Sequence, residues 1–249
     1  MSGRLDGQSA IVTGAAQGIG RAIAQRLAED GARVTVADIN AKGADTAASE
    51  IGQGAVGVAC DVSDSEAVDA LIEGAARDGA PDILVNNAAI VPFIAWDDVD
   101  LDHWRKILDV NLTSVFMTCR KATDMMRTVK REGRIVNIAS NTFFAGTPNM
   151  AAYVAAKGGI IGFTRALAIE IGKDGIRVNA LCPVAGETPL LTSFMGEDTP
   201  EIRAKFLSTI PLGRFSQPED MGEAAAFLCS DAAGMITGTA LEVDGGRCI

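Results

Sequence analysis

Short apolar runs alternate along this chain with longer segments whose apolar residues recur every three or four positions. Seven of the short runs are predicted as strands: Ser9–Thr13, Arg33–Asp38, Val56–Cys60, Ile83–Asn86, Arg134–Ala139, Arg177–Leu181 and Ala240–Val243. Helical spacing is clear in the segments 107–119 and 155–167. The strand at 83–86 lacks alternation of apolar and polar residues, as expected when helices cover both faces of a sheet. The pattern predicts an α/β fold, a doubly wound seven-stranded parallel sheet with helices on both faces.

Composition indicates one folded domain over residues 1–249. No Pro/Gly/Ser-rich linker or charge run divides the chain, and α/β domains of this length often stay single. Hydrophobic residues make up 48% and charged residues 22%, which is enough apolar material for a large core.

Charge and cysteine usage exclude several classes of partner. A formal net charge of −10 argues against nucleic acid and anionic membranes, because both attract clustered Lys and Arg. The five cysteines are odd in number, widely spaced and without a CxxC pair, so neither a disulfide framework nor a metal site is expected. The N-terminus has no apolar targeting segment, and no long apolar run appears elsewhere. We therefore expect a cytoplasmic protein with reduced thiols.

A glycine-rich turn, Thr13–Gly20, follows the first predicted strand and opens a helix expected from about Ile19 to Ala28. Glycines let the backbone turn sharply and approach a pyrophosphate, and the N–H groups at the helix start meet its negative charge. A turn of this kind is weak evidence alone, but its place between strand and helix favours dinucleotide binding over a simple tight turn.

Asp38 stands at the end of the second predicted strand, eighteen residues after Gly20. A carboxylate there can accept hydrogen bonds from the adenosine ribose and would repel a 2′-phosphate, so NAD is expected rather than NADP. The next residue, Ile39, offers no compensating cation. In the alternative reading, Asp38 caps a helix that begins near Ala41.

The only tyrosine of the chain, Tyr153, precedes Lys157 by four residues, which places both on one face of a helix. A nearby ammonium favours phenolate and lowers the phenol pKa from its usual value of about 10, so that Tyr153 could move a proton near neutral pH. Ser140 lies thirteen positions earlier. A Tyr-x-x-x-Lys pair is common by chance, and by itself it favours a core tyrosine beside a solvated lysine.

Taken in order, Thr13–Gly20, Asp38, Asn86-Asn87-Ala88, Asn111, Ser140, Tyr153 and Lys157 resemble the short-chain dehydrogenase/reductase family over essentially the whole chain. The resemblance implies a Rossmann-type domain, usually a homotetramer, that transfers hydride between a nicotinamide and an alcohol or carbonyl. It implies Tyr153 as acid/base and Lys157 on the nicotinamide ribose. Ser140 would bind the substrate oxygen, and Asn111 would anchor a proton relay.

The same resemblance implies the cofactor contacts Gly14, Gln17, Gly18, Ile19, Gly20, Asp38, Asp61, Val62, Asn87, Ala88, Tyr153, Lys157, Pro183, Gly186 and Thr188. Without it, Asp61 could equally be a helix cap, Asn87 a turn residue and Asn111 a core polar group. The chain departs from the family pattern at Ala89, Ala156 and Val184. Valine resists backbone angles that glycine permits, so the contact from Thr188 is less secure.

Family layout places the substrate among the residues after Ala89, those after Ser140 and a lid over about 185–207. The expected contacts are Val91, Phe93, Ser140, Thr142, Phe143, Asn149, Tyr153 and Ala185. Aromatic and a few polar groups together suit a compact cyclic or aromatic substrate. The phenylalanines could instead be packing residues. The segments 90–100 and 141–150 are similar to those of family members that oxidise the hemiacetal of pyridoxal, whereas the lid is not.

Three functions compete for this sequence. The first is an NAD-dependent dehydrogenase for a small cyclic, aromatic or sugar-like alcohol, such as pyridoxal hemiacetal, reversible to ketone reduction. The second is a 3-oxoacyl thioester reductase, which the acidic balance and Asp38 disfavour. The third is a non-catalytic dinucleotide-binding scaffold or sensor, which an intact Ser140, Tyr153 and Lys157 set makes improbable. The lone histidine, His103, is read as a helix-start residue.

Overall fold

Seven parallel strands form one sheet in the order β3-β2-β1-β4-β5-β6-β7. The computed structural model describes residues 4–76, 79–187, 191 and 197–249. The strands are β1 (Ser9–Thr13), β2 (Arg33–Asp38), β3 (Val56–Ala59), β4 (Ile83–Asn86), β5 (Gly133–Ile138), β6 (Ile176–Pro183) and β7 (Ala240–Val243). The predicted doubly wound parallel sheet is confirmed.

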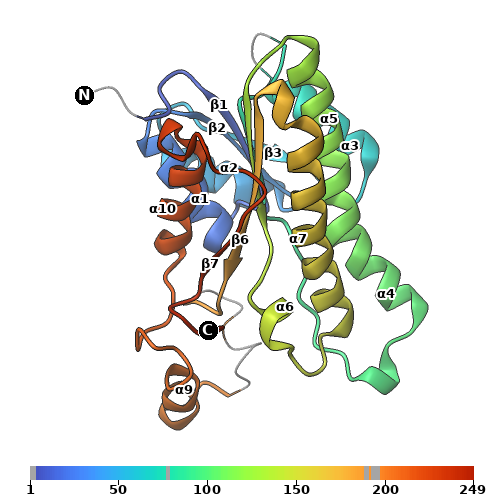
Figure 1. Cartoon of the computed structure of the whole chain (residues 1–249), viewed down its shortest axis with the longest axis vertical. Helices are drawn as coiled ribbons and strands as arrows, with labels where there is room; N and C mark the ends of the chain where they lie inside the picture. The colour runs from blue at the N-terminus through green and yellow to red at the C-terminus, as the bar shows by residue number, and fades with distance from the viewer. Residues whose placement is uncertain (1–3, 77–78, 188–190, 192–196) are drawn as a thin grey trace.

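Helices connect the strands and cover both faces of the sheet (Figure 1). They are α1 (Gly18–Glu29), α2 (Ala41–Ile51), α3 (Ser65–Ala75), α4 (Leu101–Leu108), α5 (Ser114–Thr128), α6 (Thr142–Ala145), α7 (Ala151–Ile171), α9 (Pro200–Leu207) and α10 (Pro218–Cys229). None of the described helices is long and apolar enough to cross a membrane.

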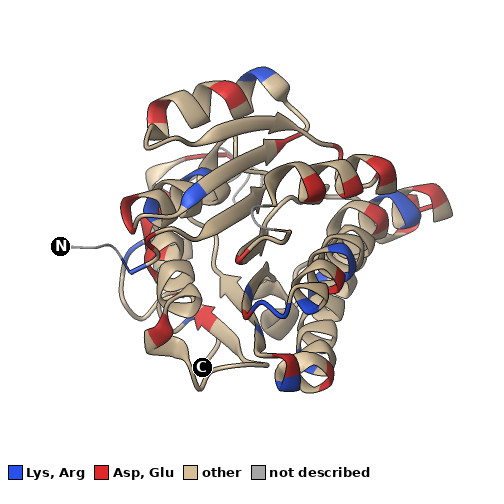
Figure 2. Cartoon of the chain, turned by 90° about the horizontal axis from the view of Figure 1, so that it is seen from above, with Lys and Arg blue, Asp and Glu red and all other residues tan. Residues whose placement is uncertain are grey.

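Each face of the sheet has its own buried core. On one face, Ile23 of α1, Ala47 of α2 and Met221 of α10 pack against the strands. On the other face, Val115 of α5 and Ile160 of α7 do so, together with apolar residues of α3. Burial on both sides explains why the strands read as continuous apolar runs. Charged segments lie around the outside of the molecule, with acidic and basic residues interspersed (Figure 2).

The order of the strands creates the site. β1 pairs with β2 on one side and with β4 on the other, so the chain winds outward in opposite directions from this point. A crevice opens there at the carboxyl ends of the strands, which is where ligands bind in open α/β sheets.

Three predicted strands differ from the structure at their ends. β3 stops at Ala59 and β5 at Ile138, although Cys60 and Ala139 still donate backbone hydrogen bonds to the neighbouring strand. β6 runs on to Pro183 because β7 pairs with it as far as Val243. These differences arise from pairing between strands, which local sequence patterns do not contain.

The helical segment predicted over 107–119 is interrupted. α4 ends at Leu108, residues Asp109–Thr113 form a π-helical turn, and α5 begins at Ser114. Inserted π-turns are rare and occur mostly at functional sites. Here the turn carries Asn111, which is fully buried.

Candidate active site

A cavity of about 1050 Å³ opens at the carboxyl ends of the strands. Its walls come from the turn after β1, the ends of β2, β5 and β6, and the segment after β4. α7 adds Tyr153 and Lys157, and α9 adds Phe206. One cavity therefore holds most of the predicted dinucleotide site and three of the predicted catalytic residues, Ser140, Tyr153 and Lys157.

The glycine turn after β1 is shaped for close backbone approach. Gly14 and Gly18 have φ angles of 64° and 58°, in the region that favours glycine. A Cβ on Gly20 would lie only 2.4 Å from both the Gly14 carbonyl oxygen and Asn87 Nδ2. Gly18, Ile19 and Gly20 line the cavity, so the start of α1 faces it, and N–H groups at a helix start are favourable partners for an anion.

Asn87 ties this turn to the end of β4. Its Nδ2 donates to the Thr13 and Gly14 carbonyl oxygens at 3.0 and 2.9 Å. Thr13 Oγ1 in turn accepts from the backbone N–H groups of Asn87 and Ala88, both at 3.1 Å. These bonds fix the two sides of the crevice. The ribose contact implied for Asn87 stays a prediction.

Asp38 lines the cavity at the end of β2 and braces the backbone there. One carboxylate oxygen accepts from Ala16 N at 3.1 Å and the other from Asn40 N at 2.9 Å. The N-cap of α2 is Asn40, which accepts from Gly43 N, so the alternative in which Asp38 caps this helix is wrong. Asp38 lines the cavity and keeps acceptor capacity for ribose hydroxyls.

Asp61 and Val62 line the same end of the cavity. Hydrogen bonds from the Ser63 hydroxyl and backbone N–H lower the pKa of Asp61. The cap of α3 is Asp64, which accepts from Glu66 N, and this excludes the reading of Asp61 as the cap. Contact of Asp61 and Val62 with adenine stays a prediction.

Ser140 follows β5 and is buried at the floor of the cavity. Its oxygen accepts from Thr142 N at 3.2 Å and from Thr142 Oγ1 at 2.9 Å. Because the oxygen already accepts these bonds, the Ser140 hydroxyl proton is left to donate toward the phenol or a substrate oxygen. Thr142 thus orients Ser140.

Tyr153 and Lys157 project from α7 into the cavity, exposed by only 6% and 2%. Lys157 Nζ donates to the Ile138 carbonyl oxygen at 2.6 Å and lies 5.6 Å from the centre of the Tyr153 ring. Burial lowers the pKa of Lys157 to about 8. Burial also raises the pKa of Tyr153 to about 12, against a smaller lowering by hydrogen bonding with the Ser140 side chain.

The protein groups alone thus do not produce the lowered phenol pKa that the sequence predicts, and this part of the expectation is corrected. The Lys157 ammonium is hydrogen-bonded to a backbone carbonyl, and burial of the phenol raises the pKa of Tyr153. The placement of the two side chains side by side agrees with the helix spacing. A positive charge brought next to the phenol by an oxidised cofactor would lower the pKa of Tyr153.

Asn111 does not line the cavity. Its amide forms two hydrogen bonds of 2.8 Å with the backbone N–H and carbonyl of Ile90. It therefore joins the π-helical turn to the segment after β4, and the core-polar reading fits its side chain. A relay through Asn111 stays a prediction that its side-chain contacts do not address.

Most of the predicted cofactor residues line the cavity: Gly14, Gln17, Gly18, Ile19, Gly20, Asp38, Asp61, Val62, Asn87, Ala88, Tyr153, Lys157, Pro183 and Gly186. Thr188 lies outside the described residues. Val184 is buried without a positive φ, so it causes no backbone strain. Gly186 meets Ser216 so closely that a Cβ would lie 2.5 Å from the Ser216 hydroxyl oxygen.

The predicted substrate residues divide into two groups. Val91, Ser140, Thr142, Tyr153 and Ala185 line the cavity. Phe93, Phe143 and Asn149 do not, and we correct their placement. Phe143 is 45% exposed and packs edge-on to Phe144, beside Gly158. Asn149 is exposed in a left-handed turn (φ 62°), where its carbonyl accepts from Ile94 N. The packing alternative therefore holds for Phe143.

Several cavity residues were not named as site residues by the sequence analysis, among them Phe206 of α9, which lies within the predicted lid, and Arg247 near the C-terminus. Arg247 comes from a segment without a motif, and only the fold brings it to the site. An aromatic wall exists, but Phe206 supplies it instead of Phe93 and Phe143.

Comparisons with known proteins agree with this geometry. The family profile described as Enoyl-(Acyl carrier protein) reductase matches residues 14–247. The chain is 44% identical to 4-formylbenzenesulfonate dehydrogenase TsaC1/TsaC2 of Comamonas testosteroni, over 98% of each chain. It is 40% identical to D-threitol dehydrogenase of Mycolicibacterium smegmatis, over 99% of this chain and 95% of that protein.

Among solved structures, a 3-ketoacyl-(acyl-carrier-protein) reductase from Brucella melitensis complexed with NADH superposes with a TM-score of 0.91. It is 43% identical, and the match covers 98% of this chain and 100% of that one. Fold, cavity and relatives define a Rossmann-type oxidoreductase. The chain belongs to the short-chain dehydrogenase/reductase family, whose members use NAD(H).

Proposed function

We propose that this protein is an NAD-dependent dehydrogenase that oxidises a small cyclic, aromatic or sugar-like alcohol and also runs in reverse as a ketone reductase. The observation that carries this proposal is that Ser140, Tyr153 and Lys157 share one cavity with the glycine-rich turn after β1 and with Asp38 at the end of β2. A hydride donor or acceptor and a proton-transfer group are then within one enclosed space.

NAD supplies the hydride acceptor when it is bound. The chain supplies the proton path, in which the Tyr153 phenolate accepts the alcohol proton while Ser140 hydrogen-bonds to the same oxygen. With a pKa of about 8, Lys157 is mostly protonated at neutral pH and favours the phenolate. Loss of one proton and one hydride converts the alcohol into a carbonyl, and the reverse transfers reduce it.

Preference for NAD over NADP follows from the charge at the end of β2. Asp38 presents a carboxylate to the cavity, and its neighbour Ile39 is apolar and 72% exposed. A 2′-phosphate placed here would meet a negative charge and gain no cation from Ile39. The ribose hydroxyls of NAD find an acceptor instead.

The compact substrate is inferred from the cavity wall and the relatives. One relative is named for an aromatic aldehyde and another for a sugar alcohol, which matches the range proposed here. Pyridoxal hemiacetal rests on the similarity of segments 90–100 and 141–150. Val91 and Thr142 of those segments line the cavity, whereas Phe93, Phe143 and Asn149 do not.

A 3-oxoacyl thioester reductase is the second candidate, because the 43% identical Brucella structure is that of a 3-ketoacyl-(acyl-carrier-protein) reductase. We also propose a homotetramer, a cytoplasmic location and a single domain whose substrate lid spans about 185–207. The lid includes α9, whose Phe206 reaches the cavity. The described cysteines are all free thiols, as a reducing compartment would keep them.

The test is NADH formation at alkaline pH with a panel of cyclic alcohols, aromatic alcohols, aldoses and pyridoxal, with a 3-hydroxyacyl thioester alongside. Turnover of a small ring alcohol with NAD at least tenfold above that with the thioester is expected. Preferential turnover of the thioester would replace this proposal with the second candidate. A binding protein without turnover would show NADH affinity and no product in any arm.

A further inference from the structure

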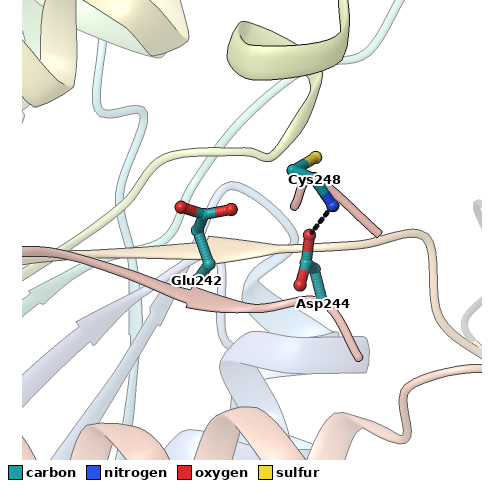
Figure 3. Close-up of side chains that lie close together, drawn as sticks. All are labelled: Glu242, Asp244 and Cys248. Carbon is teal, nitrogen blue, oxygen red and sulfur yellow. Dashed lines mark hydrogen bonds between the residues drawn. The ribbon is translucent and has the colours of Figure 1, made fainter. Parts of the chain in front are cut away.

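The last residues of the chain form a turn that is fixed against the active site. Buried Asp244 accepts hydrogen bonds from Gly246 N at 2.9 Å and from Cys248 N at 3.0 Å (Figure 3). Cys248 Sγ lies 3.7 Å from the Asn141 carbonyl oxygen, next to Ser140. Glu242 is also close to this pair, but both Asp244 oxygens already bind backbone N–H groups, so the cluster acts as a brace.

This turn presents Arg247 to the lid helix. The guanidinium carbon lies 4.1 Å from the centre of the Phe206 ring, within cation–π range. Phe206 stacks on Phe215 at 5.5 Å, and Arg203 lies 5.4 Å from the Phe215 ring on that side. Two arginines thus flank a pair of stacked phenylalanines.

The two arginines differ in how their charge is balanced. Arg203 forms ion pairs with both Glu187 and Asp198. Arg247 has no carboxylate within 4.0 Å among the described residues, and segments 188–190 and 192–196 contain no acidic residue. The nearby carboxylate of Asp244 is occupied by backbone donors.

Arg247 is half-buried and lines the same cavity as Ser140 and Tyr153. Desolvating a guanidinium without an anionic partner is unfavourable, and Phe206 offsets only part of it. A planar carboxylate matches the fork of N–H donors and would restore the balance. A half-buried guanidinium without a carboxylate partner among the described residues, on the wall of a substrate cavity, is therefore placed to recognise an anion.

We propose that Arg247 binds a carboxylate of the substrate, so that the enzyme acts on hydroxy acids whose alcohol meets Ser140 and Tyr153. This deepens the proposed function and rests on it. The competing cations are Arg105 and Lys106 of α4, which also line the cavity but are exposed, and Arg105 has Asp102 as an ion-pair partner at 3.6 Å.

The binding experiment needs no turnover. Calorimetry measures benzoate and its neutral analogue benzamide against the protein saturated with NADH, for wild type, R247Q, R247K and R105Q. Wild type should bind benzoate about tenfold more tightly than benzamide, R247Q should lose this ratio, R247K should keep part of it, and R105Q should keep all of it. A general disturbance of the lid in R247Q would weaken the binding of benzoate and benzamide alike, so it cancels in the ratio of their affinities. An unchanged ratio in R247Q, or its loss in R105Q, overturns the proposal.

A second arm separates this proposal from the proposed function. The substrates are 4-hydroxycyclohexanecarboxylate and the corresponding carboxamide, followed by NADH formation. KM should be about tenfold lower for the carboxylate in wild type, and R247Q should raise that KM while kcat changes little. Equal KM values for the two substrates overturn the role of Arg247 and leave the dehydrogenase intact. A preference for benzoate without turnover of any alcohol supports the role of Arg247 in binding a carboxylate and contradicts the proposed dehydrogenase activity.

Discussion

Burial shifts the pKa values of Tyr153 and Lys157 in opposite directions, and in both residues it favours the neutral form. It raises the pKa of the phenol to about 12 and lowers that of the ammonium to about 8. At neutral pH Tyr153 is therefore a neutral phenol, and Lys157 beside it is mostly in its charged ammonium form. Positive charge added near the phenol by the oxidised cofactor shifts the balance toward phenolate, and this couples proton transfer to cofactor binding.

Removal of the phenol hydroxyl should separate chemistry from binding. Tyr153→Phe keeps the ring in its apolar surroundings, among Ile107, Met150 and Ala152. We expect NADH affinity to stay within a few-fold of wild type and turnover to be abolished, because only the proton-transfer group is lost. Fluorescence titration with NADH and steady-state rates measure the two. Weak NADH binding in this variant would contradict the assignment.

The pH profile of alcohol oxidation should report Tyr153. A base acts in its deprotonated form, so the rate rises as pH increases through the apparent pKa. With NAD saturating, we expect this pKa to lie well below 12, and Lys157→Met should move it to higher pH and reduce the rate.

His103→Gln is the control for this profile, because His103 is exposed on α4 with its Nδ1 2.9 Å from Asp100. The control should leave the profile unchanged. A limb that persists in Lys157→Met but disappears in His103→Gln would show that the base is not Tyr153.

Cofactor choice tests the charge of Asp38. Wild type should bind NAD more tightly than NADP. Asp38→Ala should reduce this difference in binding free energy by about 1–3 kcal/mol. Since Asp38 also accepts from Ala16 N and Asn40 N, Asp38→Asn serves as the matched variant that keeps size and an acceptor oxygen. The two variants should narrow the gap similarly. Equal affinities of wild type for the two cofactors would refute the role of Asp38.

At the scale of elements, the sequence predicts what local patterns determine. β1, β2, β4 and β7 have the predicted bounds, and α1 differs by one residue at each end. The π-helical turn at Asp109–Thr113 was not predictable, because it depends on Asn111 reaching Ile90, a contact between distant segments. The same is true of β6, whose last residues are set by its pairing with β7.

The fit between the glycine turn and Asn87 gives a prediction for α1. Gly20→Ala places a Cβ 2.4 Å from the Gly14 carbonyl oxygen, so the turn must shift and NADH affinity should fall by tenfold or more, roughly. Gly74→Ala in α3 meets nothing within 4 Å and should stabilise the fold by up to about 1 kcal/mol without affecting NADH affinity. NADH titration and thermal denaturation of both variants measure this. Normal NADH affinity in Gly20→Ala would contradict the proposal that the glycine-rich turn Thr13–Gly20 binds the cofactor.

At the scale of the whole molecule, the predicted site divides by how far its residues lie from a motif. Residues in or beside motifs, such as Gly14, Asp38 and Tyr153, line the cavity as expected. Phe93 and Phe143 were predicted from the family layout of their segments together with their residue type, and they are partly exposed and do not line the cavity. Arg247 and Phe206 enter because β7 and α9 end beside the cavity, and no local pattern in the sequence reveals that.

Exposed apolar side chains on the outer surface of α5 and α7 indicate that copies of this chain associate there. Phe116 of α5 is 54% exposed and Ile169 of α7 is 84% exposed, and large apolar side chains gathered on one layer mark contact surfaces. We expect a particle of four times the chain mass of 25.8 kDa by light scattering, and Phe116→Asp should reduce it because the charge would be buried on assembly. Val56→Asp is the control, an equally exposed apolar position on the edge strand β3, and it should keep the full mass. A monomeric wild type, or a Phe116→Asp particle of unchanged mass, would remove this layer as the assembly surface.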